Sequence, residues 1–251
     1  MAERYKIYQK RSERKPNVEF DLSCFQRRPL SCELGRYIDR IQPGIFIVGG
    51  TARYVALNTI CDIPEQELPK PLDIDLLTLA RPRVYCEGSP DPFPERRIVT
   101  AGPNLDHNLQ KYLSRQDFTL NQVLVGRTTK HEQPTLFLTD QALEDYHNKI
   151  FRFSDQFGGV ERDSNGKITM IENACMTLRV ILYSLVLSPF DFTDETPNDV
   201  IIMSLRRNWK TIINDGYLKE YVERSRCFSL QDQFIANLRS CGFTVPERLI
   251  S

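Results

Sequence analysis

Apolar residues follow two different patterns in the two parts of the chain. Up to residue 155 they form short runs bounded by glycine, proline and charged residues, which is typical of strands and short helices. We expect strands at 45–48, 71–79, 84–86, 97–100 and 135–139, and a strand or helix-to-strand junction at 119–125. We expect helices at 31–41 and 51–57, a helix or loop at 104–114, and a helical turn at 142–148 followed by an extended segment at 149–153.

The second part of the chain has helical periodicity. The segment 172–187 carries apolar residues at helical spacing, and similar patterns predict helices at 196–212, 215–226 and 229–241. Two glycine-containing stretches, at 158–159 and 164–166, interrupt the pattern between the two parts. The sequence therefore predicts an α/β (α+β) fold, with a small mixed sheet and flanking helices followed by a short all-α part. We expect an N-terminal extension at 1–30, an α/β domain at 31–155 and a helical region at 156–251.

Composition and charge fit a folded protein without a strong net field. Hydrophobic residues make up 41% of the 251 residues, which suffices for a core, and 33 basic residues balance 33 acidic ones. The basic residues are unevenly placed: residues 1–28 hold eight against four acids, and residues 206–226 hold six against three. Either segment could contact a polyanion, or could simply be solvated.

The seven cysteines form no Cys-x-x-Cys pair and no zinc or haem spacing. We expect reduced thiols in an intracellular, cytoplasmic protein. Apolar runs stay shorter than the roughly 18–20 residues that span a membrane, and the charged N-terminus does not resemble a secretory signal. The sequence therefore predicts no membrane partner.

Candidate chemistry centres on two carboxylates in an apolar strand. Asp73 and Asp75 point to the same face because a strand has period two. Paired carboxylates repel each other unless a cation such as Mg²⁺ lies between them, although a solvated strand edge is the common alternative. Upstream, the strand 45–48 runs into Gly49-Gly50, a turn that either lets backbone N–H groups approach a phosphate or is ordinary chain punctuation. A phosphate cradle beside a metal-binding strand suggests chemistry on a nucleoside triphosphate.

A third segment, Gln116-Asp117-Phe118-Thr119-Leu120-Asn121 with Arg115 before it, completes an ordered set with Val48-Gly49-Gly50-Thr51-Ala52-Arg53 and the paired aspartates. This set resembles the class II tRNA nucleotidyltransferase and bacterial poly(A) polymerase family, of the polymerase-beta-like superfamily. That family carries Val-Gly-Gly-x-Val-Arg-Asp, Asp-x-Asp and Arg-Arg-Asp-Phe-Thr-x-Asn-Ala in this order. Weaker likeness continues through 143–152 and 172–180, so the resemblance covers residues 31–187, the family's head and the start of its neck.

The resemblance implies a reaction and its metal. A ribose 3′-hydroxyl, usually of an RNA end, attacks the α-phosphate of a nucleoside triphosphate such as ATP, and pyrophosphate leaves. Asp73 and Asp75 would hold two Mg²⁺ ions that clamp the attacking and leaving oxygens. Gly49, Gly50 and Thr51 would cradle the β- and γ-phosphates.

The resemblance also implies roles for polar residues around the triphosphate. Arg53 would neutralise its charge, and Arg115 and Asn121 would donate to it. Asp117 would accept from a ribose hydroxyl, although a surface ion pair with Arg115 is the ordinary interpretation without the resemblance. Arg179 would be a structural or phosphate-facing group.

Three departures from the family pattern bear on specificity. Tyr54 stands where the family has a supporting acid, and the loop 58–72 is longer than usual. In the family an Asp and an Arg on the neck helix read the base of ATP or CTP, whereas Asn173 and Met176 stand there in this chain. Asn173 still offers a donor and an acceptor, but Met176 offers no comparable hydrogen bond, so we expect an altered base preference.

The leading hypothesis is Mg²⁺-dependent transfer of a nucleotide to an RNA 3′ end, with tRNA as the expected acceptor. Two alternatives remain open. One keeps the chemistry and transfers the nucleotide to a protein or small-molecule hydroxyl. The other is a catalytically degenerate module that binds nucleotide or RNA.

Overall fold

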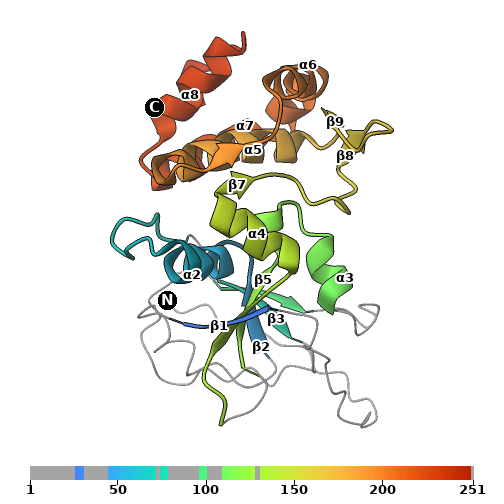
Figure 1. Cartoon of the computed structure of the whole chain (residues 1–251). Coiled ribbons are helices and arrows are strands. Elements are labelled where there is room, and N and C mark those ends of the chain that lie inside the picture. Colours follow the sequence, from blue (N-terminus) through green and yellow to red (C-terminus); the bar gives the residue numbers. More distant parts are fainter. Residues whose placement is uncertain are drawn as a thin grey trace, which may run out of the picture.

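The structure, a computed structural model, describes residues 26–30, 45–71, 74–78, 96–100, 109–127 and 131–249. The expected helix at 31–41, the expected strand at 84–86 and most of the N-terminal extension lie outside these residues. The described elements form a sheet with helices at one end of it and a group of helices beyond (Figure 1).

One six-stranded sheet lies at the base of the molecule, in the order β1-β6-β5-β2-β3-β4. The β3 and β4 strands pair in parallel, and the other neighbours pair antiparallel. The strands are β1 (Gln26–Pro29), β2 (Ile45–Val48), β3 (Ile74–Thr78), β4 (Arg96–Thr100), β5 (Val123–Gly126) and β6 (Thr135–Leu138). The predicted strands at 45–48, 97–100 and 135–139 are confirmed, and 119–125 proves to be a junction between the short helix η1 (Thr119–Asn121) and β5.

The two faces of the sheet pack against different layers because side chains alternate along each strand. On β2, Ile47 contributes to the large core that contains the helices, whereas Phe46 and Val48 join a smaller cluster on the opposite face. That smaller cluster also contains Leu77 of β3 and Leu113 of α3 (Leu109–Ser114). The alternation therefore decides which residues of β2 and β3 face the helices.

The helices α2 (Gly49–Cys61) and α4 (Asp140–Asn148) lie between the sheet and the group of helices beyond (Figure 1). The α2 helix follows β2 directly and is four residues longer at its C-terminal end than the predicted helix. Its Ala52, Val55 and Ala56 are fully buried, and small side chains on this face allow close packing.

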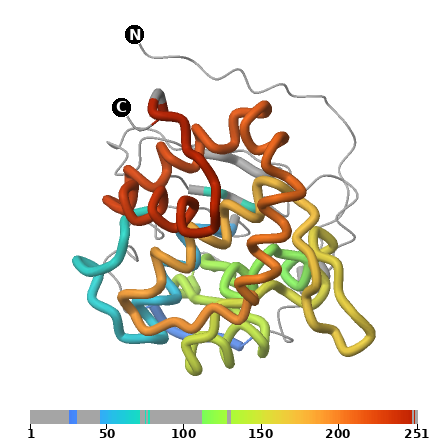
Figure 2. The backbone as a smooth tube through the Cα atoms, turned by 90° about the horizontal axis from the view of Figure 1, so that it is seen from above, coloured from blue at the N-terminus to red at the C-terminus, as the bar shows by residue number. Residues whose placement is uncertain are grey.

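The second part of the chain consists mainly of helices that gather over one end of the molecule (Figure 2). These are α5 (Ala174–Leu187), α6 (Asn198–Asn214), α7 (Tyr217–Cys227) and α8 (Gln231–Ser240), as predicted, with the short helices η2 (Ser188–Phe190) and η3 (Glu247–Leu249). The interrupted stretch before them is a β-hairpin, β8 (Val160–Arg162) with β9 (Ile168–Ile171), which the sequence did not predict. A further short pair joins β7 (Ile150–Phe151) to β10 (Thr193–Asp194) in parallel.

The fold confirms the expected α/β part followed by helices. Within the predicted extension at 1–30, however, β1 pairs with β6 at the edge of the sheet, so residues 26–29 belong to the sheet. One hydrophobic core runs from α2 and the sheet into α5, α6, α7 and α8, and it crosses the expected boundary at residue 155. Among the residues that the structure describes, no helix combines the length and apolar character that a membrane crossing requires.

Candidate active site

A carboxylate of β3 lies against the first residue of α2. Val48, the last residue of β2, pairs with Asp75, and this register places the Asp75 side chain beside Gly49. Gly49 has a φ of +66°, and a Cβ atom at this position would lie 2.8 Å from Oδ2 of Asp75. Only glycine fits such a backbone conformation and such a close approach without strain. Asp73, the other predicted metal ligand, lies outside the described residues.

The start of α2 is open to solvent only at its glycines. Gly49 and Gly50 are partly exposed, whereas Thr51 is fully buried, so its side chain faces the core. Val48 precedes the helix and contributes no capping side chain. A helix N-terminus attracts anions through its backbone N–H groups and dipole, as the predicted phosphate cradle requires.

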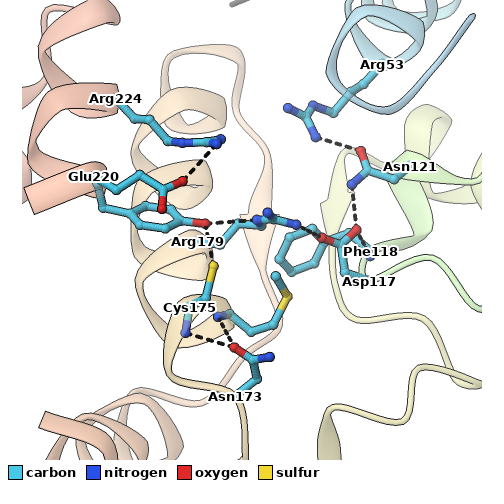
Figure 3. A network of polar contacts seen from close by, with 11 residues as sticks. Arg53, Asp117, Phe118, Asn121, Asn173, Cys175, Arg179, Glu220 and Arg224 are labelled. Carbon is cyan, nitrogen blue, oxygen red and sulfur yellow. Dashed lines mark hydrogen bonds and ion pairs between the residues drawn. The ribbon is translucent and has the colours of Figure 1, made fainter. Parts of the chain in front are cut away.

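A chain of hydrogen bonds joins three of the predicted site residues within the α/β part (Figure 3). Arg53 of α2 donates to Oδ1 of Asn121 at 2.6 Å, and Nδ2 of Asn121 donates to Oδ1 of Asp117 at 2.6 Å. The same Asp117 oxygen accepts from the backbone N–H of Phe118 at 2.9 Å. The Arg53 guanidinium also lies over the ring of Tyr183, 4.1 Å from its centroid, so a hydrogen bond and a cation–π contact both position it.

This chain continues into the helical part through Arg179 of α5. Its Nη1 donates to Oδ2 of Asp117 at 2.6 Å, and its Nε donates to the Tyr221 hydroxyl of α7 at 3.0 Å. The Tyr221 hydroxyl also lies 3.3 Å from the Sγ atom of Cys175. Burial lowers the pKa of Arg179, but the Asp117 carboxylate, Tyr221 and Tyr183 together outweigh this effect, and the pKa lies above its ordinary value. Four predicted residues, Arg53, Asp117, Asn121 and Arg179, therefore form one network that links the two parts of the fold.

Tyr112 of α3 lies near enough to both Asp75 and Asp117 for their charges to affect its phenol. Burial raises the pKa of its phenol, and the negative charges of Asp75 and Asp117 raise it further, against a hydrogen bond with Gln116. Both carboxylates thus act on one hydroxyl. No motif pointed to Tyr112, because a lone tyrosine on a six-residue helix carries no distinctive spacing.

Other predicted residues lie apart from this network. Arg115 is exposed and, within the described part of the chain, its side chain makes no hydrogen bond or ion pair. Asn173 caps α5, because its Oδ1 accepts from the backbone N–H groups of Cys175 and Met176 at 2.9 and 3.2 Å (Figure 3). Met176 is buried at 7% exposure. Arg115 is available to a ligand, whereas the acceptor of Asn173 is already occupied.

The residues that would hold Mg²⁺ are partly described. Asp75 supplies one oxygen-rich, partly exposed carboxylate at a contact that only a glycine permits, which fits a hard cation next to a phosphate site. Among the described residues no three His, Cys, Asp or Glu side chains come together as a ligand group, and Asp73 is not one of these residues. The donor chemistry fits one or two carboxylates with substrate oxygens completing the coordination.

A cleft opens beside the network, between α2, α5 and α7. Its lining includes Gly50 and Arg53 of α2, Tyr183 of α5, and Tyr221 and Arg224 of α7. The sequence marked Arg224 only as part of the basic segment 206–226, because it is the folded chain that brings α7 to the same cleft as α2.

Comparisons with solved structures show that this fold is shared with CCA-adding enzymes. A CCA-adding enzyme in complex with CTP matches with a TM-score of 0.55 and 16% identity, over 86% of this chain and 55% of that one. A CCA-adding enzyme in complex with ATP matches with a TM-score of 0.51 and 16% identity, over 86% and 54%. The chain thus spans about half the length of these enzymes. No protein-family model and no curated protein sequence matches it.

Proposed function

We propose that the protein transfers a nucleotide from a nucleoside triphosphate to an RNA 3′ end in a Mg²⁺-dependent reaction, with tRNA as the acceptor. The observation that carries this proposal is the Asp75 carboxylate against Gly49 at the start of α2. The carboxylate can bind a cation and the N-terminus of α2 can bind an anion, so this contact places the two kinds of site next to each other. The fold shared with CCA-adding enzymes, solved with CTP and with ATP, supports the same assignment.

The reaction forms one phosphoester bond and breaks one phosphoanhydride bond. The RNA 3′-hydroxyl oxygen bonds to the α-phosphorus, the bond from that phosphorus to the bridging oxygen breaks, and pyrophosphate leaves with the electron pair. The hydroxyl proton passes to water. Two Mg²⁺ ions, held by Asp75 and by Asp73 two residues earlier in the sequence, would supply charge stabilisation at the attacking and leaving oxygens.

The protein's own groups would orient the triphosphate. The backbone N–H groups at Gly49 and Gly50 would receive the β- and γ-phosphates, and the exposed Arg115 would donate to them. Arg53 is held by Asn121 and Tyr183, so its charge lies at a fixed place near the start of α2. Fixed donors stabilise developing negative charge without reorganisation.

The network revises the role that the resemblance implies for Asp117. Three donors occupy its carboxylate, from Phe118, Asn121 and Arg179. A carboxylate has about four acceptor positions, so at most about one remains for a ribose hydroxyl. We propose that Asp117 mainly orients Asn121 and Arg179.

The test is incubation of the full chain with total tRNA, Mg²⁺ and each of the four labelled nucleoside triphosphates, followed by sequencing of the RNA 3′ ends. We expect incorporation by the wild type and none by Asp75→Asn or Asp73→Ala. Chelation by EDTA should stop incorporation, and added Mg²⁺ should restore it. Asp62→Asn is the matched control, because it makes the same carboxylate-to-amide change at an exposed position beyond the other end of α2.

Two results would contradict the proposal in different ways. Wild-type activity in both aspartate variants would refute the assignment of the metal ligands. Label on a protein or a small molecule, with none on RNA, would refute the acceptor but keep the chemistry.

A further inference from the structure

The start of α5 is poorly suited to reading a base in this chain. The Oδ1 atom of Asn173 is occupied by two backbone donors of the helix, and Met176 beside it is buried and apolar. A protein that selects among nucleotides needs a donor or acceptor that is free to face the base edge. At Asn173 only the Nδ2 donors remain for this purpose, so, if the proposed function holds, a second group must contribute to base selection.

The cleft between α2, α5 and α7 begins where the triphosphate is proposed to bind. Gly50, in the first turn of α2, and Arg224 of α7 are both among the residues that line it. Tyr183 and Tyr221 also line it, but Tyr221 is only 1% exposed, and the guanidinium groups of Arg53 and Arg224 lie over the rings of Tyr183 and Tyr221 respectively. A ligand with phosphates at Gly50 would thus extend toward α7.

The lining of this cleft fits a flat, electron-rich ring attached to an anion. Its charged lining residues among those described are two guanidinium groups, Arg53 and Arg224, and no carboxylate lines it. A guanidinium plane is one of the surfaces on which proteins stack nucleic-acid bases. The positive charge of the cleft therefore fits an anionic ligand that carries a base, as a nucleotide does.

Arg224 pairs with no residue in the described segments of the α/β part. Its Nη2 pairs with Glu220, one turn earlier on α7, at 2.9 Å, and its guanidinium lies 5.6 Å from the ring centroid of Tyr221 (Figure 3). A guanidinium has five N–H groups, so this ion pair orients the fork and leaves other donors for a ligand. Arg53, by contrast, is held by Asn121 and Tyr183.

We infer that the cleft between α2, α5 and α7 binds the base of the incoming nucleoside triphosphate and that Arg224 selects the base. This inference rests on the proposed function and specifies where its substrate is recognised. Glu220 is a positioning residue, because it contacts Arg224 and does not line the cleft.

The chemistry of Arg224 predicts which bases are preferred. A guanidinium offers only donors, so it makes two hydrogen bonds to a base with two neighbouring acceptors. Guanine presents the neighbouring acceptors O6 and N7, and cytosine presents O2 and N3. In adenine the 6-amino donor lies next to both N1 and N7, and in uracil the N3–H donor separates the two carbonyl oxygens. We expect GTP or CTP to bind more tightly than ATP and UTP.

The test measures binding of ATP, CTP, GTP, UTP and inorganic tripolyphosphate to the full chain in Mg²⁺, without RNA, by titration calorimetry. Arg224→Gln should weaken binding of the preferred nucleotide about tenfold or more and should remove the preference. Tripolyphosphate binding should stay within about twofold, because the phosphates bind at the other end of the cleft. Arg224→Lys keeps the charge and lacks the fork, so it should also lose the preference.

Lys219→Gln is the matched control. It removes a positive charge from the same helix, where Lys219 pairs with Glu223 one turn later at an exposed position. This variant should bind all five ligands as the wild type does. Equal circular dichroism spectra of the variants would show that α7 remains folded.

The outcomes separate this inference from the proposed function. A wild type that binds nucleotides without base preference, or Arg224 variants that keep the preference, would overturn the inference alone. Weakened binding of a single-stranded RNA end by Arg224→Gln, with nucleotide binding intact, would overturn it in favour of the RNA base. A wild type that binds neither nucleotide nor tripolyphosphate would overturn both.

Discussion

At the scale of single residues, one glycine determines the geometry of the candidate site. Gly49 ends the turn from β2 with a φ of +66°, and its missing side chain leaves the space that Oδ2 of Asp75 occupies. Gly50 differs: a Cβ atom there would meet only Nη2 of Arg53, at 3.9 Å. The two neighbouring glycines of this motif therefore differ, because the local geometry requires a glycine at position 49 and does not require one at position 50.

This difference predicts different effects of alanine. Gly49→Ala should lower the free energy of unfolding by about 1–3 kcal/mol, because the left-handed conformation penalises a Cβ atom and the Asp75 carboxylate must move. Nucleotide incorporation should fall with it. Gly50→Ala should leave the free energy of unfolding unchanged or slightly raised. Urea denaturation of both variants tests this, and equal losses of stability would contradict the geometry.

A second residue-level prediction concerns the reactivity of cysteines. Burial raises the pKa of Cys61 to about 11, and its thiol donates to the backbone carbonyl of Tyr146 at 3.4 Å. At pH 8 only about one such thiol in a thousand is ionised, and the thiolate is the reactive form. Iodoacetamide should therefore modify the exposed Cys227 well before Cys61, as peptide mass spectrometry can measure.

The same shift has a consequence for stability. Cys61 binds its proton more tightly in the folded protein than its ordinary value of 9.0 would imply. Its contribution to the free energy of unfolding is therefore full below pH 9 and is lost as the pH rises toward 11. Rapid alkylation of Cys61 in the native protein at pH 8 would show that the end of α2 opens easily.

The sequence predicted individual site residues well where a motif fixed their spacing. Arg53, Asp117 and Asn121 come from two separate motifs, and the fold brings them within hydrogen-bonding distance. Tyr112 and Arg224 could not be predicted in this way, because no motif contains them and only the folded chain brings Tyr112 near the two carboxylates and Arg224 into the cleft.

At the scale of elements, an ion pair fixes α4 to the chain that follows it. The Asp145 carboxylate is fully buried, and it accepts from Nε of Arg152 at 2.9 Å and from Nη2 at 2.8 Å. Such a two-pronged contact is stronger and more directional than a single ion pair. It holds β7 against α4 and so positions the segment before the hairpin.

Removing one partner of this pair should be costly. Arg152→Ala leaves a buried carboxylate without its main donor, so we expect the free energy of unfolding to fall by about 3 kcal/mol. Arg152→Lys keeps the charge but lacks the planar fork, so it should lose less. Chemical denaturation measures both. A loss below about 0.5 kcal/mol for Arg152→Ala would mean that water replaces the contact.

The hairpin of β8 and β9 shows why short elements escaped prediction. Its strands have three and four residues, too few to establish an alternating pattern. The glycine-containing stretch at 164–166, which interrupts the sequence pattern, proves to be the turn of this hairpin. In the turn, Oδ1 of Asp163 accepts from the backbone N–H groups of Asn165 and Lys167, and Gly166 has a φ of +80°. The longer helices α5 to α8 were predicted because their periodicity extends over several turns.

At the scale of the whole molecule, the polar network and the hydrophobic core join the same two parts. The core runs from the sheet into the helices, and Arg179 of α5 reaches Asp117 across the same boundary. The sequence predicted both parts, but the register between them depends on contacts between distant segments. No local pattern could specify it.

This arrangement predicts that Asp117 and Arg179 are energetically coupled. Asp117 is 9% exposed and Arg179 28%, so water screens their 2.6 Å contact only partly. A double-mutant cycle with Asp117→Ala and Arg179→Ala should give a coupling energy of about 2 kcal/mol in urea denaturation. Each single variant should also weaken nucleotide incorporation, because Asn121 and Arg53 lose a fixed neighbour.

A second ion pair in the chain supplies the comparison for this cycle. Arg207 and Glu161 approach to 3.3 Å, but their side chains are 56% and 46% exposed and both belong to the helical part with its hairpin. An exposed ion pair is only slightly more favourable than the hydration of its two separate charges. The double-mutant cycle of Arg207 and Glu161 should therefore give a coupling energy of less than about 1 kcal/mol. Equal coupling in the two cycles would mean that the contact between Asp117 and Arg179 is solvated in solution. The two parts of the fold would then be held by the apolar core and by the pairing of β7 with β10, and the network would not fix the triphosphate site rigidly against the helices.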